Sequence, residues 1–374
     1  MSSNSDKTYF FESAVPCLRQ RNFCRRLQDY LDANGYYRTE DHMNADIIMI
    51  DTCGFHQFAE DLSVEMIKKY FDSKSSSSKL VVVGCLTNIN YDRLSKISDK
   101  IKLVTPSELD KLDVIFDAKF PISSIPIPTS VHSTSCFLRN FDEVVSVHIS
   151  RGCAGSCTYC AGRFGMGKTV SRPLKEIVDV LKVCVDKKAK FIHLETQDLG
   201  GYGLDINTSI VELLQEVFIL EGEHKFILHD FNARFFIKYY NDIKELLIKN
   251  NNKIAYLNVP VESGSNRILK LMNRQYCIED VEEVLFDLKN KVPKLELWCN
   301  IMCGFPTETE EDFEKTKEFV TKFSSFESTY AWITPYADRP NTKASKIKGK
   351  INQKLIDERI KCLSKIVKLG SVFV

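Results

Sequence analysis

Three cysteines lie within one short, glycine-rich segment, CAGSCTYC at positions 153–160. Thiolates at this spacing on a single loop can bind one metal centre, and the glycines at 152, 155 and 162 let the backbone wrap closely around it. A zinc site usually takes four ligands, often in two pairs, whereas no fourth cysteine lies near this loop. Cys153, Cys157 and Cys160 therefore predict a cubane [4Fe–4S] cluster with one iron left open for a substrate or cofactor. A group of small buried cysteines is the alternative, and it fits such a loop poorly.

A second set of cysteines is spread along the first part of the chain. Cys17, Cys53 and Cys85 each follow a predicted strand, at the turn into a helix. In an open parallel sheet, the carboxyl ends of the strands form one edge, which is where ligands bind. We therefore expect these three thiolates to converge on a second cluster, again with an open iron. Their spacing alone equally allows cysteines buried in a hydrophobic core.

The elements that must position these cysteines repeat as strand, turn and helix, which predicts an α/β fold. In residues 1–120, apolar runs predict an open parallel, Rossmann-like sheet with strands at 8–15, 45–52, 79–84 and 101–105. Residues 121–140 are rich in proline and serine and predict a linker. In residues 141–340, six strand–helix pairs predict a partial (β/α)6 barrel, with strands at 143–150, 191–197, 225–231, 254–262, 295–305 and 328–336. Residues 341–374 read as a basic, mostly helical tail.

The composition is that of an ordinary folded protein. The chain has 374 residues with 44% hydrophobic and 27% charged residues, which excludes a disordered or collagen-like chain. Lys and Arg number 51 against 50 Asp and Glu, so the net charge of +1 is unlike that of a strongly basic nucleic-acid binder. No signal peptide or long apolar run is present, so we expect a cytoplasmic protein without membrane contact. We also expect a monomer.

The histidines show no metal-binding pattern in the sequence. Seven are scattered along the chain, and His148, His193 and His229 lie in or near predicted strands. None has a partner at metal-ligand spacing, so we predict that each has a structural role.

The cysteine loop after the first barrel strand resembles the radical S-adenosylmethionine (SAM) superfamily. Within that superfamily the chain is similar to the methylthiotransferases that modify tRNA adenosines or a ribosomal-protein aspartate. The resemblance runs from about residue 8 to about residue 369, on the segments ADIIMIDTCGF, VVVGC, SRGCAGSCTYC, LETQDLGGYGLD, VPVESGSNRILKLMNRQY, CGFPTETEEDF and ERIKCLSKI.

The resemblance implies two [4Fe–4S] clusters with separate roles. The cluster on Cys153, Cys157 and Cys160 would bind SAM and, given one electron from a flavodoxin- or ferredoxin-type donor, cleave it to methionine and a 5′-deoxyadenosyl radical. The auxiliary cluster on Cys17, Cys53 and Cys85 would deliver a methylated sulfur to the carbon radical that follows, with a second SAM as methyl donor. The cofactors supply the difficult chemistry, while the protein binds and orients the reactants.

Placement and similarity together indicate the SAM pocket. Active sites of barrels lie at the carboxyl ends of the strands. The predicted cofactor-binding residues are therefore Tyr159, Glu195, Gln197, Glu262, Ser263, Met302, Gly304 and Phe305.

The chain departs from the family's usual residues at five positions. The family usually has Gly before the first auxiliary cysteine and Asn three after it, where this chain has Pro16 and Gln20. Arg163 and Met166 replace the usual Pro and Arg after the cysteine loop, and Glu262 replaces Gln. We predict that Arg163 and Met166 belong to a loop facing the substrate.

We predict a radical-SAM methylthiotransferase acting on a peptide or protein side chain, for example a ribosomally made precursor. This expectation rests on the low net charge, on the altered loop, and on a chain that stops about where a substrate-gripping TRAM domain would begin. The alternative substrate is a tRNA adenosine, which the basic tail would suit. A non-catalytic iron–sulfur protein, or an enzyme that inserts sulfur without methylation, would fit the cysteines alone.

Overall fold

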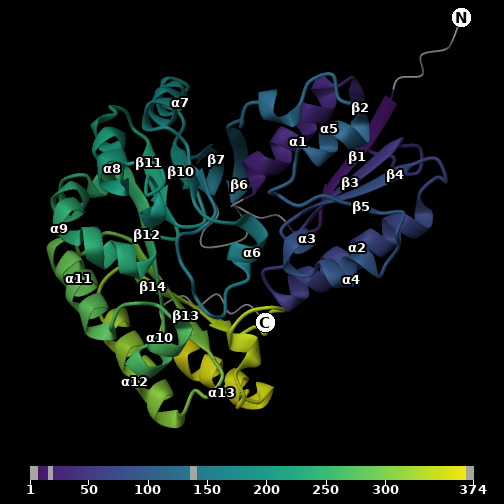
Figure 1. Cartoon of the computed structure of the whole chain (residues 1–374). Helices are drawn as coiled ribbons and strands as arrows, with labels where there is room; N and C mark the ends of the chain where they lie inside the picture. The colour runs from purple at the N-terminus through teal and green to yellow at the C-terminus, as the bar shows by residue number, and fades with distance from the viewer. Residues whose placement is uncertain (1–6, 16–19, 135–140, 368–374) are drawn as a thin grey trace, which may run out of the picture. The chain divides into compact units, whose positions relative to one another are not determined.

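The computed structural model describes residues 7–15, 20–134 and 141–367. The chain divides into two compact units, which are described separately below (Figure 1). The first unit comprises Met1–Ser130, Cys160–Gly167 and Arg339–Asn341, and the second comprises Val131–Tyr159, Lys168–Asp338 and Thr342–Val374. The first boundary falls inside the predicted linker, and a second one falls between the last two residues of the cysteine loop.

The first unit is built on a five-stranded parallel sheet in the order β2-β1-β3-β4-β5. Its strands are β1 (Lys7–Ser13), β2 (Tyr36–Arg38), β3 (Ile47–Thr52), β4 (Lys79–Gly84) and β5 (Lys102–Leu103). The sequence predicted the other four strands but not β2. That strand has three residues, two of them exposed, so it offers almost no pattern to read.

Helices cover both faces of this sheet, which explains why every residue of β3 is buried. On one face, Leu27 and Tyr30 of α1 (Arg21–Ala33) share a core with Leu112 of α5 (Lys111–Phe116). On the other, Ile67 of α2 (Gln57–Ser73) shares a core with Leu94. The short helices are α3 (Leu86–Ile89), α4 (Tyr91–Ser95) and α6 (Gly162–Met166).

The second unit contains a seven-stranded sheet in the order β14-β13-β12-β11-β10-β7-β6. The six predicted barrel strands are present and pair in parallel: β7 (Phe141–His148), β10 (Phe191–Glu195), β11 (Lys225–Leu228), β12 (Ile254–Glu262), β13 (Leu297–Cys303) and β14 (Thr329–Pro335). The predicted linker was wrong in one part, because Ser130–Thr134 forms the edge strand β6. A short edge strand can form through backbone pairing with its neighbour, without an apolar pattern of its own.

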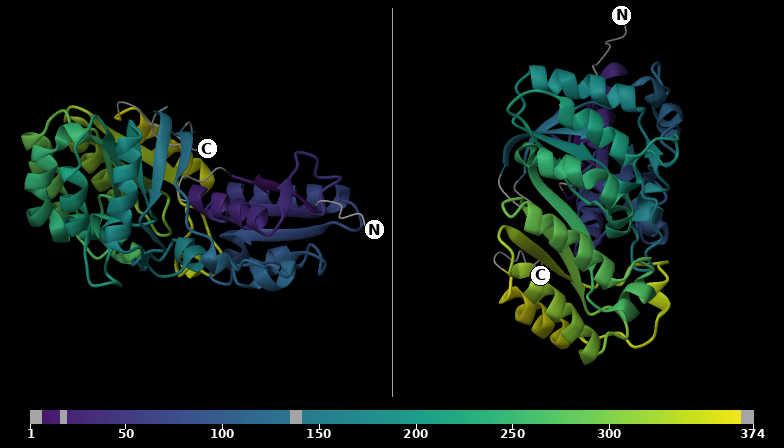
Figure 2. Two further views of the ribbon diagram at one scale, coloured as in Figure 1. Left: turned by 90° about the horizontal axis from the view of Figure 1, so that it is seen from above. Right: turned by 90° about the vertical axis from the view of Figure 1, so that its left-hand side faces the viewer.

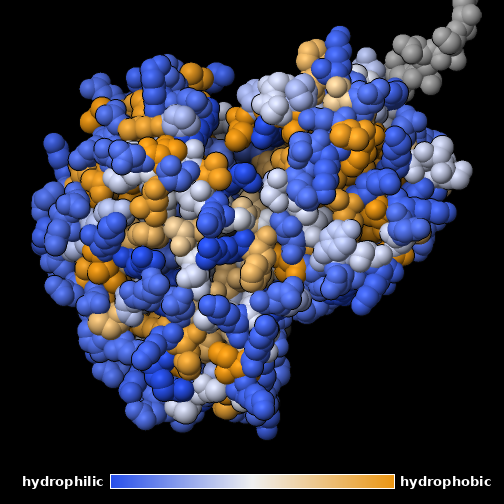
Figure 3. All heavy atoms as spheres, viewed as in Figure 1, coloured by the Kyte–Doolittle hydropathy of each residue, from blue (hydrophilic) through white to orange (hydrophobic). Residues whose placement is uncertain are grey.

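Helices line one face of the barrel sheet, as the teal and green ribbons of Figure 2 show. They are α7 (Leu174–Asp186), α8 (Ile210–Ile219), α9 (Ala233–Lys249), α10 (Asn266–Met272), α11 (Ile278–Lys291), α12 (Glu310–Ser324) and α13 (Gln353–Ser364). The predicted tail contains α13, whose Ile356, Ile360 and Leu363 join the barrel core. The face shown in Figure 3 mixes polar and apolar groups in the ordinary way. Among the described residues, no helix combines the length and apolar character needed to cross a bilayer.

Candidate active site

The barrel strands have two chemically different faces, because successive side chains point to opposite sides of a strand. One face packs on the helices and forms the main core, with Ile192 and Leu194 as examples from β10. On the other face, a separate apolar cluster forms a floor at the amino-terminal ends of the strands; its buried members are Val144, Ile227, Tyr256 and Trp298. Above that floor the same face turns polar, and this polar surface is the candidate site.

Three histidines, which the sequence predicts to have structural roles, lie on this polar face. His193 Nδ1 lies 3.2 Å from Ser146 Oγ, and the rings of His193 and His229 are 6.4 Å apart. His148 Nδ1 lies 3.5 Å from Glu195 Oε1. The alternation along the strands could have predicted this placement: His148 and His193 lie in strands and His229 directly follows β11, each at a position that points away from the helices.

Two buried carboxylates at the carboxyl ends of the strands keep unsatisfied oxygen atoms. Glu195 and Asp198 are each 2% exposed, and Glu195 Oε2 and Asp198 Oδ1 have no hydrogen-bond partner among the described residues. Burial raises the pKa of Asp198 to about 7. Buried acceptors without a donor are costly, so these atoms are suited to a ligand that brings N–H or O–H groups.

The cysteine loop is closed at its base by a short antiparallel ribbon of β8 (Ser150–Arg151) and β9 (Val170–Ser171). Cys153 Sγ accepts a hydrogen bond from the Gly155 N–H at 3.2 Å and lies 3.5 Å from Asp198 Oδ2. A Cβ at Gly155 would stand 3.2 Å from Cys153 Sγ and 3.7 Å from Cys157 Sγ. Glycine at this position therefore leaves space between the two sulfurs.

Arg274 is a site residue that sequence reasoning did not single out. Its side chain is buried, and Nη1 donates to Cys157 Sγ at 3.3 Å while Nη2 donates to the Pro260 carbonyl at 2.7 Å. An N–H donated to the sulfur of Cys157 would stabilise the negative charge of a cluster-bound thiolate. The segment that contains Arg274 carried part of the family resemblance, and that was the available signal.

Glu262 ends β12 in an unusual backbone conformation, with φ at 76°. Side chains other than glycine rarely adopt this conformation, which is typical of functional turns. The residue is 8% exposed, and burial raises the pKa of its carboxyl, although Arg274 and Tyr159 lower it. Glu262 thus lies beside the arginine that contacts Cys157.

Three of the predicted cofactor-binding residues form one apolar wall. Tyr159 packs with Met302 and the fully buried Phe305 in a small cluster. The turn between the last two needs glycine, since Gly304 has φ +84° and a Cβ there would lie 2.4 Å from an Ile356 side-chain carbon.

The remaining two predicted cofactor residues have local partners. Gln197 Oε1 accepts a hydrogen bond from the Gly152 N–H and so holds the start of the cysteine loop. Ser263 is completely buried, and its hydroxyl lies 3.2 Å from Thr316 Oγ1 and accepts from the Ser265 N–H. Ser263 therefore stabilises the turn after β12.

The carboxyl edge of the first unit's sheet holds two of the predicted auxiliary cysteines at the ends of neighbouring strands. Strands β3 and β4 pair Thr52 with Gly84, and Cys53 and Cys85 come directly after them. Gly84 has φ +95°, and a Cβ there would lie 2.4 Å from the Thr52 carbonyl oxygen, so the two strand ends meet at a glycine. Cys17 falls in residues 16–19, outside the described residues, although β1 ends at this same edge.

Helix α6 belongs to the first unit and lies against Cys85. Met166 is 8% exposed, with its sulfur 3.3 Å from Cys85 Sγ, whereas Arg163 is exposed. The structure therefore places these two residues of the predicted substrate-facing loop in different surroundings. Cys160, just before α6, accepts a hydrogen bond from the Gly162 N–H at 3.3 Å.

The cysteine loop fits an iron–sulfur cluster by its donor chemistry. Each of its three sulfurs faces an N–H donor, two from the loop backbone and one from an arginine. Such hydrogen bonds stabilise the negative charge of cluster-bound thiolates. Within the described ranges, no three histidine, cysteine or carboxylate side chains are grouped as a single metal ion would require.

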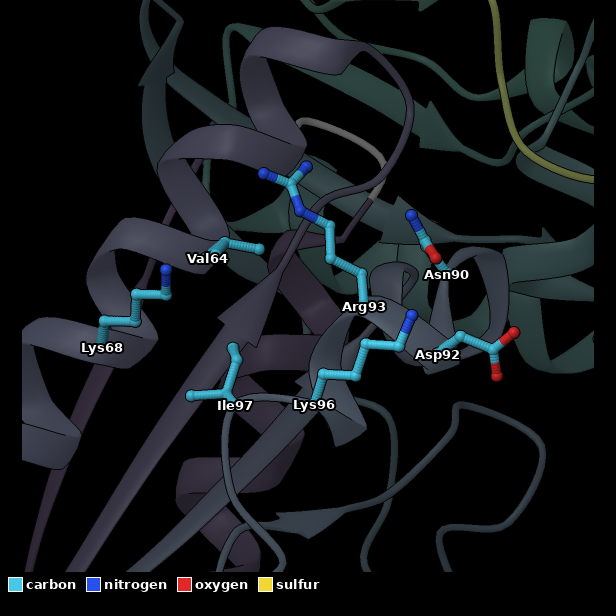
Figure 4. Close-up of a pocket in the computed structure, with 7 residues that line it drawn as sticks. All are labelled: Val64, Lys68, Asn90, Asp92, Arg93, Lys96 and Ile97. Atoms are coloured by element: carbon cyan, nitrogen blue, oxygen red, sulfur yellow. The ribbon is translucent and has the colours of Figure 1, made fainter.

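A shallow pocket of about 440 Å³ lies elsewhere on the first unit (Figure 4). Its lining residues are Val64, Lys68, Asn90, Asp92, Arg93, Lys96 and Ile97. The Arg93 guanidinium is already paired with Glu60 and Asp61, at 2.6 and 2.7 Å. This pocket contains none of the predicted site residues.

Comparison with known proteins agrees with this geometry. Residues 147–320 match the radical SAM superfamily, and residues 13–106 match the uncharacterized protein family UPF0004. The threonylcarbamoyladenosine tRNA methylthiotransferase MtaB of Aquifex aeolicus is 29% identical, over 86% of this chain and 78% of its own. The ribosomal protein uS12 methylthiotransferase RimO of Carboxydothermus hydrogenoformans is also 29% identical, over 96% of this chain and 82% of its own.

The two family models and these relatives together support the methylthiotransferase family of radical-SAM enzymes. Radical-SAM methylthiotransferases use SAM and two [4Fe–4S] clusters. The fold has solved counterparts: the radical SAM methyltransferase TsrM of Kitasatospora setae has a TM-score of 0.62 and 13% identity, over 91% of this chain and 77% of its own. That likeness concerns the fold alone.

Proposed function

We propose that this methylthiotransferase inserts its methylthio group at an unactivated C–H of a peptide or protein side chain. Relatives named for tRNA and for a ribosomal protein match the chain with equal identity, so similarity does not choose between them. The balance of charge favours a protein, with 51 Lys and Arg against 50 Asp and Glu. Affinity for tRNA depends heavily on phosphate contacts from an excess of cations.

We further propose that the two sets of cysteines divide the work. Cys153, Cys157 and Cys160 would hold the cluster that binds SAM, and Cys17, Cys53 and Cys85 the auxiliary cluster. The bound clusters and SAM supply radical formation and sulfur transfer. The protein's own residues would bind and orient SAM: the buried oxygens of Glu195 and Asp198 would accept from its amino and hydroxyl groups, and Tyr159 and Met302 would pack on its adenine, with the buried Phe305 supporting them from behind. The electron would come from a flavodoxin- or ferredoxin-type donor.

Iron analysis tests the ligand assignment. The anaerobically reconstituted chain should hold about eight irons, and replacing the three cysteines of the 153–160 loop with alanine should leave about half. Cys277→Ala is the matched control, because Cys277 lies at the start of α11 and contacts Asp280. Iron that fell to zero in the triple variant, or did not change, would contradict two separate clusters.

Product mass tests the substrate. The reconstituted enzyme, with SAM, a sulfide source and a reductant, is offered candidate peptides, uS12 protein and tRNA in parallel. We expect a methylthio increment on a peptide or protein, and binding that changes little with salt. Modification of tRNA alone, with a steep salt dependence of binding, would overturn the proposal.

A tRNA substrate is the second candidate, and a specific observation favours it. Three phenylalanines of the first unit are exposed in segments next to predicted cluster ligands: Phe55 and Phe58 follow Cys53, and Phe164 lies on α6. Their exposed fractions are 38%, 70% and 43%. Exposed aromatic rings are the usual stacking surfaces for unpaired bases. If tRNA is the substrate, Phe58→Ala should weaken tRNA binding several-fold while reductive SAM cleavage is unchanged.

A further inference from the structure

Gln20 occupies the N-cap position of α1 but does not cap the helix. Its side chain is buried at 5% exposure and turns toward two sulfur atoms. Nε2 lies 3.0 Å from Cys85 Sγ and 2.8 Å from Met166 Sδ. A glutamine amide has two N–H groups, so one is available for each sulfur.

This arrangement gives up two ordinary stabilising features. Ser, Thr, Asp or Asn at an N-cap would satisfy an N–H of the first helical turn, which Gln20 leaves without a side-chain partner. Its Oε1 is buried and has no hydrogen-bond partner among the described residues. Positions where a sequence breaks local rules without a local gain are often functional, and here the gain is at Cys85.

Met166 reaches the same sulfur from a separate part of the chain. Its Sδ is 3.3 Å from Cys85 Sγ, and the neighbouring Gly165 allows the approach, because a Cβ there would lie 2.9 Å from the Cys85 Cβ. The contacts of Gln20 and Met166 all lie within the first unit. Both residues replace ones that the family usually has, and the structure shows that the two replacements touch each other.

We propose that Gln20 is a positioning residue that raises the reduction potential of the auxiliary cluster, and that Met166 holds its amide in place. An N–H donated to a ligand sulfur stabilises the extra negative charge of the reduced cluster, so reduction becomes easier. The thioether of Met166 is soft and apolar; it fills the space beside the amide and keeps water away from the N–H···S bond. This inference rests on Cys85 being an auxiliary ligand, as proposed above.

A redox titration tests the role of Gln20 directly. The experiment uses the full-length chain with alanine at 153, 157 and 160, so that only the auxiliary cluster remains, and follows its reduced state by electron paramagnetic resonance. Gln20→Leu keeps the bulk of the side chain but removes the N–H groups. We expect it to shift the reduction equilibrium about tenfold toward the oxidised form, which is ~59 mV for one electron. Gln20→Glu adds a negative charge and should shift the equilibrium further in the same direction.

The matched control is Gln28→Leu, on the same helix, where the amide donates to the Cys24 carbonyl and accepts from Arg38. Gln28→Leu should leave the potential unchanged. The inference would be overturned if the Gln20→Leu and Gln20→Glu variants both bound the cluster and had the same reduction potential as the parent. Absence of iron from the parent would instead contradict the proposed ligand set. If Gln20→Leu alone lost its cluster, the reduction potential of the Gln20→Glu variant, compared with that of the parent, would decide whether Gln20 affects the cluster.

Discussion

A buried ion pair fixes the turn that follows β13, and breaking it gives a test of the barrel's construction. Arg359 of α13 and Glu308 lie 2.7 Å apart, with side chains 3% and 1% exposed. Glu308 Oε2 also accepts the Gly304 N–H at 2.8 Å. The pair therefore links a helix of the predicted tail to the Gly304–Phe305 turn beside the candidate SAM pocket.

Arg359→Met keeps much of the side-chain volume but leaves the Glu308 carboxylate buried without its counter-charge. Removing one partner of such a pair costs about 3–5 kcal/mol. Lys315→Met is the matched control, because Lys315 forms an exposed pair with Glu311 on α12 at 2.7 Å. Exposed pairs contribute little, so the control should unfold like the parent.

The free energy of unfolding that Arg359→Met loses should increase with pH. Burial already raises the pKa of Glu308, and Arg359 lowers it, so the pKa rises further in the variant. When the pKa of a carboxyl is higher in the folded state than in the unfolded state, its contribution to stability is complete below the unfolded-state pKa. That contribution is lost as the pH rises through the folded-state pKa. The deficit of Arg359→Met should therefore be largest near pH 8 and should narrow toward pH 5.

Tryptophan fluorescence can follow this unit alone. The chain has two tryptophans, Trp298 on β13 and Trp332 on β14, and both belong to the second unit. With a urea m-value of about 3 kcal/mol/M, the midpoint of unfolding should fall by about 1 M or more at pH 8. A midpoint equal to that of the parent, or the same loss at pH 5 and pH 8, would refute the reasoning.

Two further predictions concern the cysteines and a glycine. Replacing Cys17, Cys53 and Cys85 together with alanine should abolish methylthio product but leave reductive SAM cleavage measurable, assayed as 5′-deoxyadenosine; loss of cleavage in a folded variant would contradict the division of roles. Gly264→Ala should destabilise the barrel strongly, because the new Cβ would lie 2.4 Å from the Lys315 carbonyl oxygen, a backbone atom. Urea unfolding checks this, and an unchanged midpoint would mean that α12 can shift at little cost.

The strands that could be predicted are those with a long or fully buried apolar pattern. The run 45–52 predicted β3 because both of its faces are covered, and the six barrel strands followed from alternation with helices. Strands β2 and β6 could not be predicted in this way. Both are short edge strands, and backbone pairing with a neighbouring strand decides whether such segments form.

The candidate site could be predicted as far as it depends on strand ends. Parallel topology places Cys53 and Cys85 at one edge, and the register of β3 with β4 agrees. The contact between Arg274 and Cys157 joins residues 117 positions apart, and no local pattern encodes it. No local pattern encodes the contact between Gln20 and Met166 either, because it depends on where α6 packs.

Side chains alternate between the two faces of the barrel strands, and one face becomes polar toward the strand ends. This polarity explains why that face is a candidate binding site and not a second hydrophobic core. On β12, Tyr256 belongs to the apolar floor, Asn258 two residues later bonds to Asn300 at 2.8 Å, and Glu262 ends the strand. Polarity thus rises along the strand toward its carboxyl end. Burying such a gradient without a ligand would cost stability, and the unpaired oxygens of Glu195 and Asp198 lie where that cost is greatest. A polar, charged ligand with an apolar ring at one end, as SAM has, would offset this cost at the ends of the strands and leave the apolar floor intact.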